Sequence, residues 1–329
     1  MPDVSVIIPT RNRWELLSSL GLPSARDQED LDLEVLVVDD GSTDGTEKRL
    51  QEIGDPRLVV LRSDTSTGVA GARNRGIAAA GGEWLAFLDD DDLWSPRKLR
   101  SQLDVAVATQ ADFVYTSTVV VDARGRAIES QPAPDPATVH DQLLTWNVIG
   151  GGSNVLARTA LVRELGGFDE RLFHLADWDM WIRLAAAGRA AAVEEILLAY
   201  VIHAANLHTA ERDSASDFSL MMSKHPLSCP AAAIAHARWR ATGHRGAGRR
   251  FRAAREYLRA AVRYRKAGLF VRGVVVLLGE CAMRLPGSTR RGRVTVPAWL
   301  ERLLAERATG AEGQIDSLVT GADSSGPVG

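Results

Sequence analysis

The chain has 329 residues, 45% of them hydrophobic and 25% charged, which is the composition of a globular protein with a sizeable core. Its formal net charge of −3 at pH 7 gives no electrostatic indication of a nucleic-acid partner, and two cysteines are too few for a disulfide framework. The first residues lack the regions of a signal peptide, and no apolar run reaches the roughly 20 residues that span a bilayer, so we expect a cytoplasmic protein.

The first third of the chain alternates short apolar runs with helical patterns. We expect strands at residues 4–9, 34–38, 57–62 and 84–88, and helices at residues 13–20, 43–53, 68–81 and 96–109. Ser42 or Thr43 is the expected N-cap of the second helix. This alternation predicts an α/β fold with a mostly parallel sheet flanked by helices. Right-handed crossovers bring residues 10–13, 39–44 and 89–92 to one edge of that sheet.

Four consecutive carboxylates, Asp89 to Asp92, follow the apolar run at residues 84–88. Adjacent acids repel one another, so this cluster at the mouth of a packed sheet favours a bound cation. Oxygen ligands suit Mg2+ or Mn2+, which commonly also hold the phosphates of a substrate. The alternative is a solvated loop in which an aspartate caps the next helix. Because open α/β sheets bind ligands at the carboxyl ends of their strands, we favour a metal–diphosphate site.

Later strands and one amphipathic helix are expected up to residue 202. The predicted strands are residues 112–121, 153–157 and 193–202, and residues 129–138 are rich in proline and loop-like. Residues 177–187 are predicted to form a helix, since Trp178, Trp181 and Ile182 are spaced to bury one face.

The composition shifts after about residue 207. Residues 236–265 are rich in arginine with a helical pattern, and residues 269–285 form an apolar helical stretch. Residues 246–285 could therefore lie on an anionic membrane surface as a peripheral contact. The alternative, which we favour, is a helical extension packed on the main domain. We expect residues 309–329, rich in Gly, Ser and Asp, to be a disordered tail.

Five segments, in this order, resemble the family 2 glycosyltransferases, which are inverting enzymes of the GT-A fold. They are residues 4–13, 38–44, 68–76, 87–92 with an Asp-x-Asp motif, and 166–181 with Gly-Gly-Phe-Asp-Glu and Asp-Trp-Asp-Met-Trp. The resemblance spans residues 4 to about 206. It implies a GT-A domain at residues 1–207, with a nucleotide-sugar half at 1–121 and an acceptor half at 122–207. Residues 208–308 are then a helical C-terminal extension.

The resemblance also implies the donor site. The nucleotide-binding residues would be Pro9, Thr10, Arg11 and Arg13 beside the base, Asp40 on the uracil N–H, and Arg73, Asp89 and Asp90 toward the phosphates. Asp91 would hold Mn2+ or Mg2+, together with Asp89 and His203. Taken alone, Asp40 could instead form a turn, Arg73 could face solvent, and His203 could bond to backbone.

An inverting transfer needs a base that accepts the proton of the acceptor hydroxyl. The resemblance gives this role to Asp177, with Asp179 or Asp169 as alternative bases or helix caps. Ala176 departs from the Glu-Asp pair of the family. This departure keeps open a sugar-nucleotide-binding protein with impaired catalysis.

The expected activity is a metal-dependent, inverting transfer of one sugar from a UDP- or dTDP-sugar to an acceptor hydroxyl. The acceptor could be a glycan, a lipid-linked molecule or a small molecule, and the sequence does not indicate the oligomeric state. The Gln-x-x-Arg-Trp motif of processive synthases is missing after residue 206, which favours non-processive transfer. A sugar-nucleotide nucleotidyltransferase is the nearest enzymatic rival, but the Gly-rich, Lys-containing first loop that it needs is not found. Dinucleotide and P-loop enzymes are rejected because their glycine motifs are absent.

Overall fold

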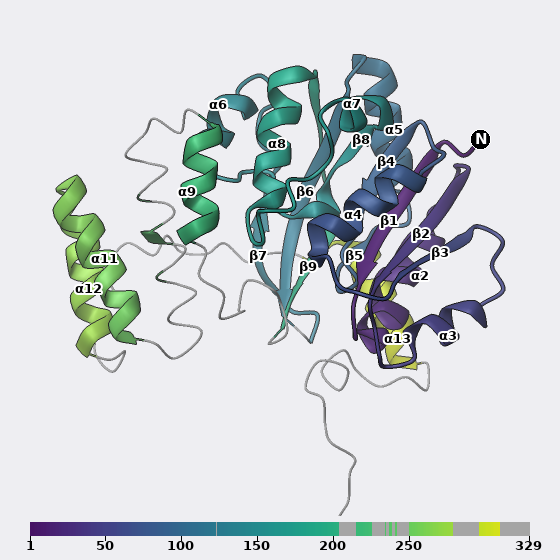
Figure 1. Cartoon of the computed structure of the whole chain (residues 1–329), viewed down its shortest axis with the longest axis horizontal. Helices are drawn as coiled ribbons and strands as arrows, with labels where there is room; N and C mark the ends of the chain where they lie inside the picture. Colours follow the sequence, from purple (N-terminus) through teal and green to yellow (C-terminus); the bar gives the residue numbers. More distant parts are fainter. Residues whose placement is uncertain are drawn as a thin grey trace, which may run out of the picture.

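A computed structural model describes residues 1–122, 124–203, 215–225, 250–278 and 296–309, with four single residues between 234 and 241. In these ranges, nine strands form one mixed sheet (Figure 1). Four parallel strands lie side by side in the order β3 (Leu58–Ser63), β2 (Leu33–Asp40), β1 (Val4–Thr10) and β4 (Trp84–Phe87). This half of the sheet confirms the predicted parallel α/β arrangement.

The second half of the sheet changes direction. β8 (Leu156–Arg158) pairs antiparallel with both β4 and β6 (Phe113–Asp122). β6 pairs parallel with β9 (Ala190–Ile202), whereas β5 (Leu93–Trp94) and β7 (Ala127–Gln131) pair antiparallel with β9 and β6 respectively. The sheet is therefore parallel on the side that carries the carboxylate cluster and mixed on the other.

Helices cover both faces of this sheet. One face carries α4 (Gly68–Ala79), α6 (Val139–Leu143), α7 (Thr159–Glu164), α8 (Ala176–Ala187) and α9 (Ala215–Lys224). The other carries α1 (Trp14–Leu16), a π-helical turn (Leu17–Gly21), α2 (Leu22–Arg26) and α5 (Lys98–Thr109), while α3 (Thr46–Gln51) precedes β3. Every residue of β1 is buried, because Ile7 packs with Phe87 in the first layer and Val6 packs with Leu99 in the second.

Some local predictions need correction. The helix predicted at residues 13–20 continues to Arg26 through the π-helical turn. Gly21 allows this course, because its backbone N–H donates to the carbonyl of Asp90 at 3.3 Å and an added Cβ would lie 3.0 Å from the Asp90 Cα. Neither Ser42 nor Thr43 caps α3, which begins at Thr46 after Gly45 in the left-handed region.

Two further corrections concern the acceptor half. Residues 129–131, expected in a loop, belong to β7 because they pair with the long strand β6. Residues 153 and 154, expected in a strand, belong to a 3-10 turn at Gly152–Asn154, and β8 begins at Leu156. The Asn154 side chain explains this turn: it bonds to the backbone N–H and carbonyl of Thr116 at 2.7 and 3.0 Å and so turns away from the ladder.

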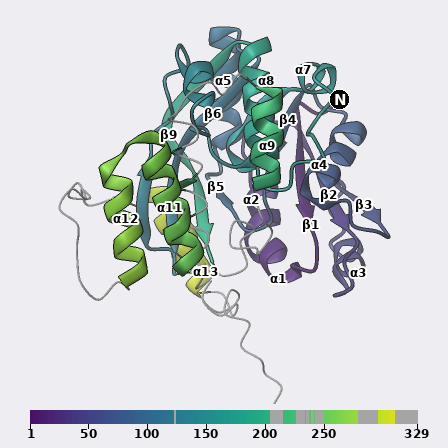
Figure 2. The same ribbon diagram turned by 60° about the vertical axis from the view of Figure 1, so that its left-hand side comes forward.

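The C-terminal region is helical where the structure describes it, as predicted. α13 (Ala298–Thr309) packs Leu300 against β6 and β9, and the Trp299 indole donates to the carbonyl of Ile196 at 2.8 Å. α11 (Arg250–Tyr264) and α12 (Ala267–Leu278) form a hairpin and lie side by side in both views (Figures 1 and 2). Of the predicted tail, residues 310–329 lie outside the described residues. In the part of the chain that the structure describes, none of the helices is long and apolar enough to cross a membrane.

Candidate functional site

The loops after β1, β2 and β4 meet at one edge of the sheet, as the alternation predicted. The Thr10 hydroxyl donates to Asp90 Oδ2 at 2.7 Å, which joins the loops after β1 and β4. The backbone N–H of Asn12 donates to Ser42 Oγ at 2.9 Å, and its side-chain oxygen accepts from the Thr43 N–H at 2.7 Å. The chain therefore brings together segments 30 to 80 residues apart.

Arg13 binds two of the four clustered acids. Its guanidinium contacts Asp90 Oδ1 at 2.9 Å and forms a short ion pair with Asp91. Burial raises the pKa of Asp90 to about 7, against the opposing charge of Arg13. Burial also acts to raise the pKa of Asp91, but the hydrogen bond from His203 and the charge of Arg13 outweigh it and leave that pKa lowered. Asp91 is therefore the acid of this pair that stays ionised.

The other two acids of the cluster have separate environments. Asp89 is the most exposed, with 29% of its side chain accessible, and pairs with Arg73 at 2.6 Å. Asp92 is buried, accepts from Ser153 Oγ at 2.5 Å, and has a pKa raised well above its usual value by burial and by Asp91. Ser153 also accepts the Asp89 N–H at 3.0 Å, so the segment before β8 holds the loop. Ser153 was not among the residues predicted for this site, and its only signal in the sequence is the Gly-Gly-Ser run at residues 151–153.

Arg73 connects the cluster to Asp177 of α8. Its guanidinium is 3% exposed and joins Asp89 to Asp177, with which it forms a short ion pair. Burial raises the pKa of Asp177, Arg73 lowers it, and the net direction is upward. Gly152 is required here, because an added Cβ would lie 2.5 Å from Arg73 Nη2. Arg73 therefore does not face solvent.

Asp40 is held by the start of α4. Each of its carboxylate oxygens accepts two hydrogen bonds, at 2.6 to 3.0 Å, from Ser66, Thr67 and Gly68. Burial acts to raise its pKa, but these bonds prevail and lower it. Since a carboxylate offers about four lone-pair sites, none is left for a nucleobase. Asp40 therefore holds the start of α4 and does not form the alternative turn at Gly41, and its contact with a uracil stays a prediction.

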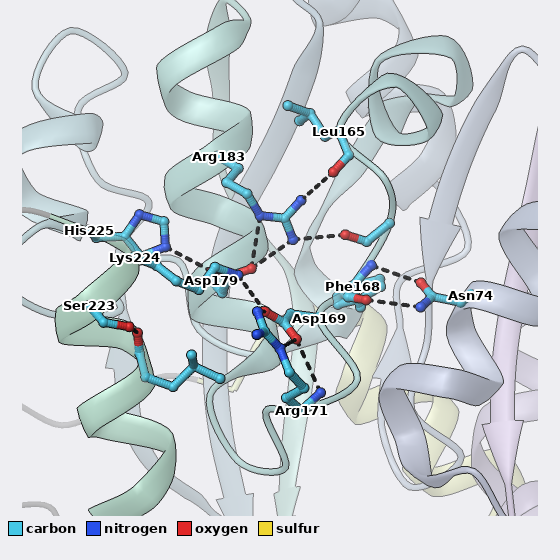
Figure 3. Close-up of polar contacts among 12 residues, drawn as sticks. Asn74, Leu165, Phe168, Asp169, Arg171, Asp179, Arg183, Ser223, Lys224 and His225 are labelled. Atoms are coloured by element: carbon cyan, nitrogen blue, oxygen red, sulfur yellow. Dashed lines mark hydrogen bonds and ion pairs between the residues drawn. The ribbon is translucent and has the colours of Figure 1, made fainter.

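Asp179 lies in a different network, on α8 and against the end of α9 (Figure 3). Its side chain is fully buried and accepts from Arg183, from Lys224 at 2.6 Å and from His225 at 2.8 Å. Burial acts to raise its pKa, but these donors lower it to about 2. Lys224 also reaches Asp169 at 2.7 Å. Both alternative bases are thus committed to ion pairs.

The Gly-Gly-Phe-Asp-Glu segment is fastened to α4 in the same region (Figure 3). The Asn74 side chain donates to the Phe168 carbonyl at 2.9 Å and accepts its N–H at 2.8 Å. Arg183 donates to the carbonyls of Leu165 and Gly167 at 2.9 and 2.8 Å. Because Asn74 follows Arg73 on α4, the acceptor-side segment and the arginine between the acids share one rigid support.

The remaining predicted residues lie around this centre. Pro9 is buried in β1 opposite Val38 of β2, and Arg11 is exposed. His203 follows β9, its side chain is fully buried, and its Nε2 lies 2.9 Å from Asp91 Oδ2. This contact brings a histidine to the cluster, rather than leaving it bonded to backbone alone.

Asp91 and His203 offer the cluster a carboxylate oxygen and an imidazole nitrogen that could bind a divalent cation. Asp91 Oδ2 and His203 Nε2 lie 2.9 Å apart, at hydrogen-bond distance, and Arg13 pairs with the same oxygen. Within the described ranges, His, Cys, Asp and Glu side chains do not gather in a group of three or more that could hold a metal ion. Two protein ligands completed by phosphate oxygens and water would match the usual coordination of Mg2+.

Comparison with known proteins identifies the family of this chain. The family model described as "Glycosyl transferase family 2" matches residues 5–166. The Escherichia coli UDP-Glc:alpha-D-GlcNAc-diphosphoundecaprenol beta-1,3-glucosyltransferase WfgD is 31% identical over 181 residues, which are 55% of this chain and 69% of that protein. The chain belongs to glycosyl transferase family 2.

Further relatives and solved structures match only part of their own length or have low sequence identity. The succinoglycan biosynthesis protein ExoO of Rhizobium meliloti is 32% identical over 59% of this chain, and the match spans 59% of its own length. S. aureus TarS 1–349 in complex with UDP-GlcNAc aligns with a TM-score of 0.53 at 18% identity, covering 82% of this chain and 79% of that one. The mannosyltransferase PcManGT of Pyrobaculum calidifontis aligns with a TM-score of 0.55 at 20% identity, covering 85% and 81%. These alignments confirm the predicted GT-A fold for this family 2 chain.

Proposed function

We propose that this family 2 chain transfers a single sugar from a nucleoside-diphosphate sugar to an acceptor hydroxyl, with inversion and without processive extension. The observation that carries the proposal is the buried Arg73, whose two terminal nitrogens join Asp89 of the acidic cluster to Asp177 of α8. One guanidinium thus links the candidate phosphate side to the candidate base. The reacting sugar carbon would lie between those two sides.

Arg13 and Arg73 are proposed to bind the diphosphate. Arg73 is buried and Arg13 is half-buried beside the acidic loop, and the Nε of each is a buried donor without a hydrogen-bond partner. Charge-assisted bonds from arginine to phosphate are strong because the planar guanidinium offers several aligned donors. Pro9, Thr10 and Arg11 are proposed to lie along the nucleotide, and Asp90 to orient Arg13.

A divalent cation is proposed to assist the departure of the diphosphate. Asp91 and His203 would hold it, with Asp89 nearest the open side of the cluster. When bound, such an ion neutralises the negative charge that develops on the leaving diphosphate. PcManGT, a neighbour in fold, is described in complex with GDP-Man and Mn2+, and we propose Mn2+ or Mg2+ here.

Asp177 is the proposed base. The acceptor oxygen bonds to the sugar carbon while the bond from that carbon to the diphosphate breaks, and the hydroxyl proton moves to the Asp177 carboxylate. Its raised pKa increases its affinity for this proton, and 22% of its side chain is accessible. Asp179 has four donors on its carboxylate and a pKa lowered to about 2, so it is disfavoured as the base.

The donor and acceptor classes rest on relatives. WfgD and WfaP of Escherichia coli are both named for UDP-Glc and for a diphosphoundecaprenol-linked acceptor. We propose a UDP- or dTDP-sugar as donor and a lipid-linked sugar as acceptor. Ala176, buried beside Asp177, favours one alternative: a protein that binds the sugar nucleotide without turning it over.

A donor-hydrolysis assay with a panel of UDP-, dTDP- and GDP-sugars and Mn2+ tests the proposal. We expect turnover of a UDP- or dTDP-sugar and a loss of about 10²- to 10⁴-fold in Asp177→Asn, because the amide cannot accept the proton. Calorimetry should find UDP affinity unchanged in that variant. Nucleotide binding without turnover of any donor would support the binding protein instead, and full activity of Asp177→Asn would refute the assigned base.

A further inference from the structure

We propose that the α11–α12 hairpin is a docking surface for an anionic lipid bilayer. Residues 250–278 contain seven arginines, one lysine and one acid, a net charge of +7 in a chain whose total is −3. This concentration of positive charge belongs to two helices that pack against each other in an antiparallel pair. A cluster of this sign and density is complementary to anionic headgroups.

The hairpin core uses small residues and leaves large apolar ones outside. Its buried side chains are mainly alanines with one tyrosine and one leucine, namely Ala253, Ala254, Tyr257, Ala260, Ala261 and Leu269, and they pack with Ala241. Gly273 allows close contact, because an added Cβ would lie 2.8 Å from Leu258 Cγ. Phe270 is 53% exposed. Packing of the two helices therefore does not account for this phenylalanine.

One end of the hairpin combines both features. Val262 is 76% exposed one turn before the connection at residues 265–266, and Phe270 and Val271 (53% and 43% exposed) follow one turn after it. Four exposed cations accompany them in the sequence, namely Arg263, Arg265, Lys266 and Arg272. We define these seven residues as the hairpin tip. Exposed apolar and cationic side chains at the same end of the hairpin fit the interface between acyl chains and anionic headgroups.

The apolar residues distinguish a bilayer from a nucleic acid. A phosphate backbone would be bound by the arginines alone and would leave Val262 and Val271 in water. A bilayer takes up both, since apolar side chains enter the acyl boundary while arginines stay among the headgroups. None of the described helices could cross the membrane, so the contact that we infer is peripheral.

Vesicle sedimentation of the full chain tests this surface separately from the transfer activity. We expect binding to vesicles of equal parts phosphatidylglycerol and phosphatidylcholine to exceed binding to pure phosphatidylcholine by about tenfold or more, and to weaken with added salt. Arg263→Gln/Arg265→Gln/Lys266→Gln and, separately, Val262→Ser/Phe270→Ser/Val271→Ser should each lose about tenfold. Lys48→Gln on α3 and Val107→Ser on α5, both exposed, are the matched controls.

Tryptophan fluorescence tests insertion of the hairpin tip directly, with variants that still bind vesicles. The emission of Phe270→Trp, compared with that of the parent chain, should shift to shorter wavelength with phosphatidylglycerol vesicles and not with phosphatidylcholine. Val107→Trp should not shift with either. Failure of the parent chain to bind anionic vesicles, or undiminished binding by both triple variants, would overturn the proposal. Preferential binding of duplex DNA through the same arginines, with no vesicle binding, would overturn it as well. None of these outcomes depends on whether the protein transfers a sugar.

Discussion

Asp177 and Asp179 lie two residues apart on α8, yet their surroundings are opposite. Asp177 has a raised pKa, part of its side chain is accessible, and its ion pair is to Arg73, which Asp89 also contacts. Asp179 is fully buried, saturated with donors from α8, Lys224 and His225, and has a pKa lowered to about 2. A carboxylate with free lone pairs can exchange a proton, whereas one whose lone pairs all accept hydrogen bonds stabilises the fold.

The largest expected effect on the Asp177 side comes from Arg73→Met. Removing this cation leaves Asp89 and Asp177 without their shared partner, so we expect the free energy of unfolding to fall by about 3–5 kcal/mol, with loss of donor turnover. Urea unfolding measures the first and donor hydrolysis the second. Arg75→Met, two residues along α4 with a hydrogen bond to Ser63, is the matched control and should cost about 1 kcal/mol. Equal costs for both variants would contradict a special role for Arg73.

Asp91→Ala should remove the metal-dependent part of nucleotide stabilisation. At about 100 times its Kd, a ligand adds roughly 2.7 kcal/mol to the free energy of unfolding, so UDP with Mn2+ should clearly raise the Tm of the parent chain. Thermal melts with Mn2+ or EDTA measure the difference. Asp104→Ala, exposed on α5, should behave like the parent chain. If EDTA leaves the stabilisation of the parent chain intact, Asp91 and His203 do not hold a cation.

Asp179→Asn should lower stability in a pH-dependent way. The folded pKa of about 2 lies below the unfolded value of about 3.9, so the carboxylate contributes stability above about pH 5 and loses it as pH falls from about 4 to 2. The shift corresponds to about 3 kcal/mol at pH 7. Urea unfolding from pH 2.5 to pH 7 should show the variant and the parent converging toward acid pH. A constant difference across that range would mean that packing, not charge, accounts for the loss.

The smallest expected effect is the difference in stability between the alanine variants of Gly166 and Gly167. Both have positive φ, but a Cβ at Gly167 would lie 2.4 Å from Asn74 Oδ1, whereas nothing lies within 4 Å of one at Gly166. Gly166→Ala should therefore cost about 1–2 kcal/mol from backbone strain alone. Gly167→Ala should cost more and should also lower donor turnover, because Asn74 follows Arg73. Equal losses of stability and turnover in the two variants would show that the hydrogen bonds of Asn74 to the Phe168 backbone do not contribute.

Local patterns were sufficient for the parallel half of the sheet. The runs at residues 4–9 and 84–88 are apolar enough to be buried on both faces, and β1 and β4 are buried throughout. The acidic loop was also predicted, because four carboxylates after a buried strand need compensating charge. β7 was missed, since residues 129–131 are polar and exposed and become a strand through pairing with β6.

The roles within the site were harder to predict. Asp40 and Asp177 were both named from resemblance, but one meets the N–H groups of α4 and the other meets Arg73. Ser153 was not identified, although it holds the loop of the acidic cluster from 61 residues away. The partners of a side chain come from distant segments of the chain, and a local sequence pattern does not specify which of them will contact it.

The order of strands and helices up to β4, the acidic loop and the five family motifs follow from this sequence alone, because each depends on residues close together in the chain. Tertiary structure decided which acid stays reactive. Residues i and i+2 of a helix point to different sides, and here one side faces Arg73 of α4 and the other faces Lys224 and His225 at the end of α9. The proton affinity of each carboxylate therefore depends on the residues that pack against its side of α8, not on its place in the motif.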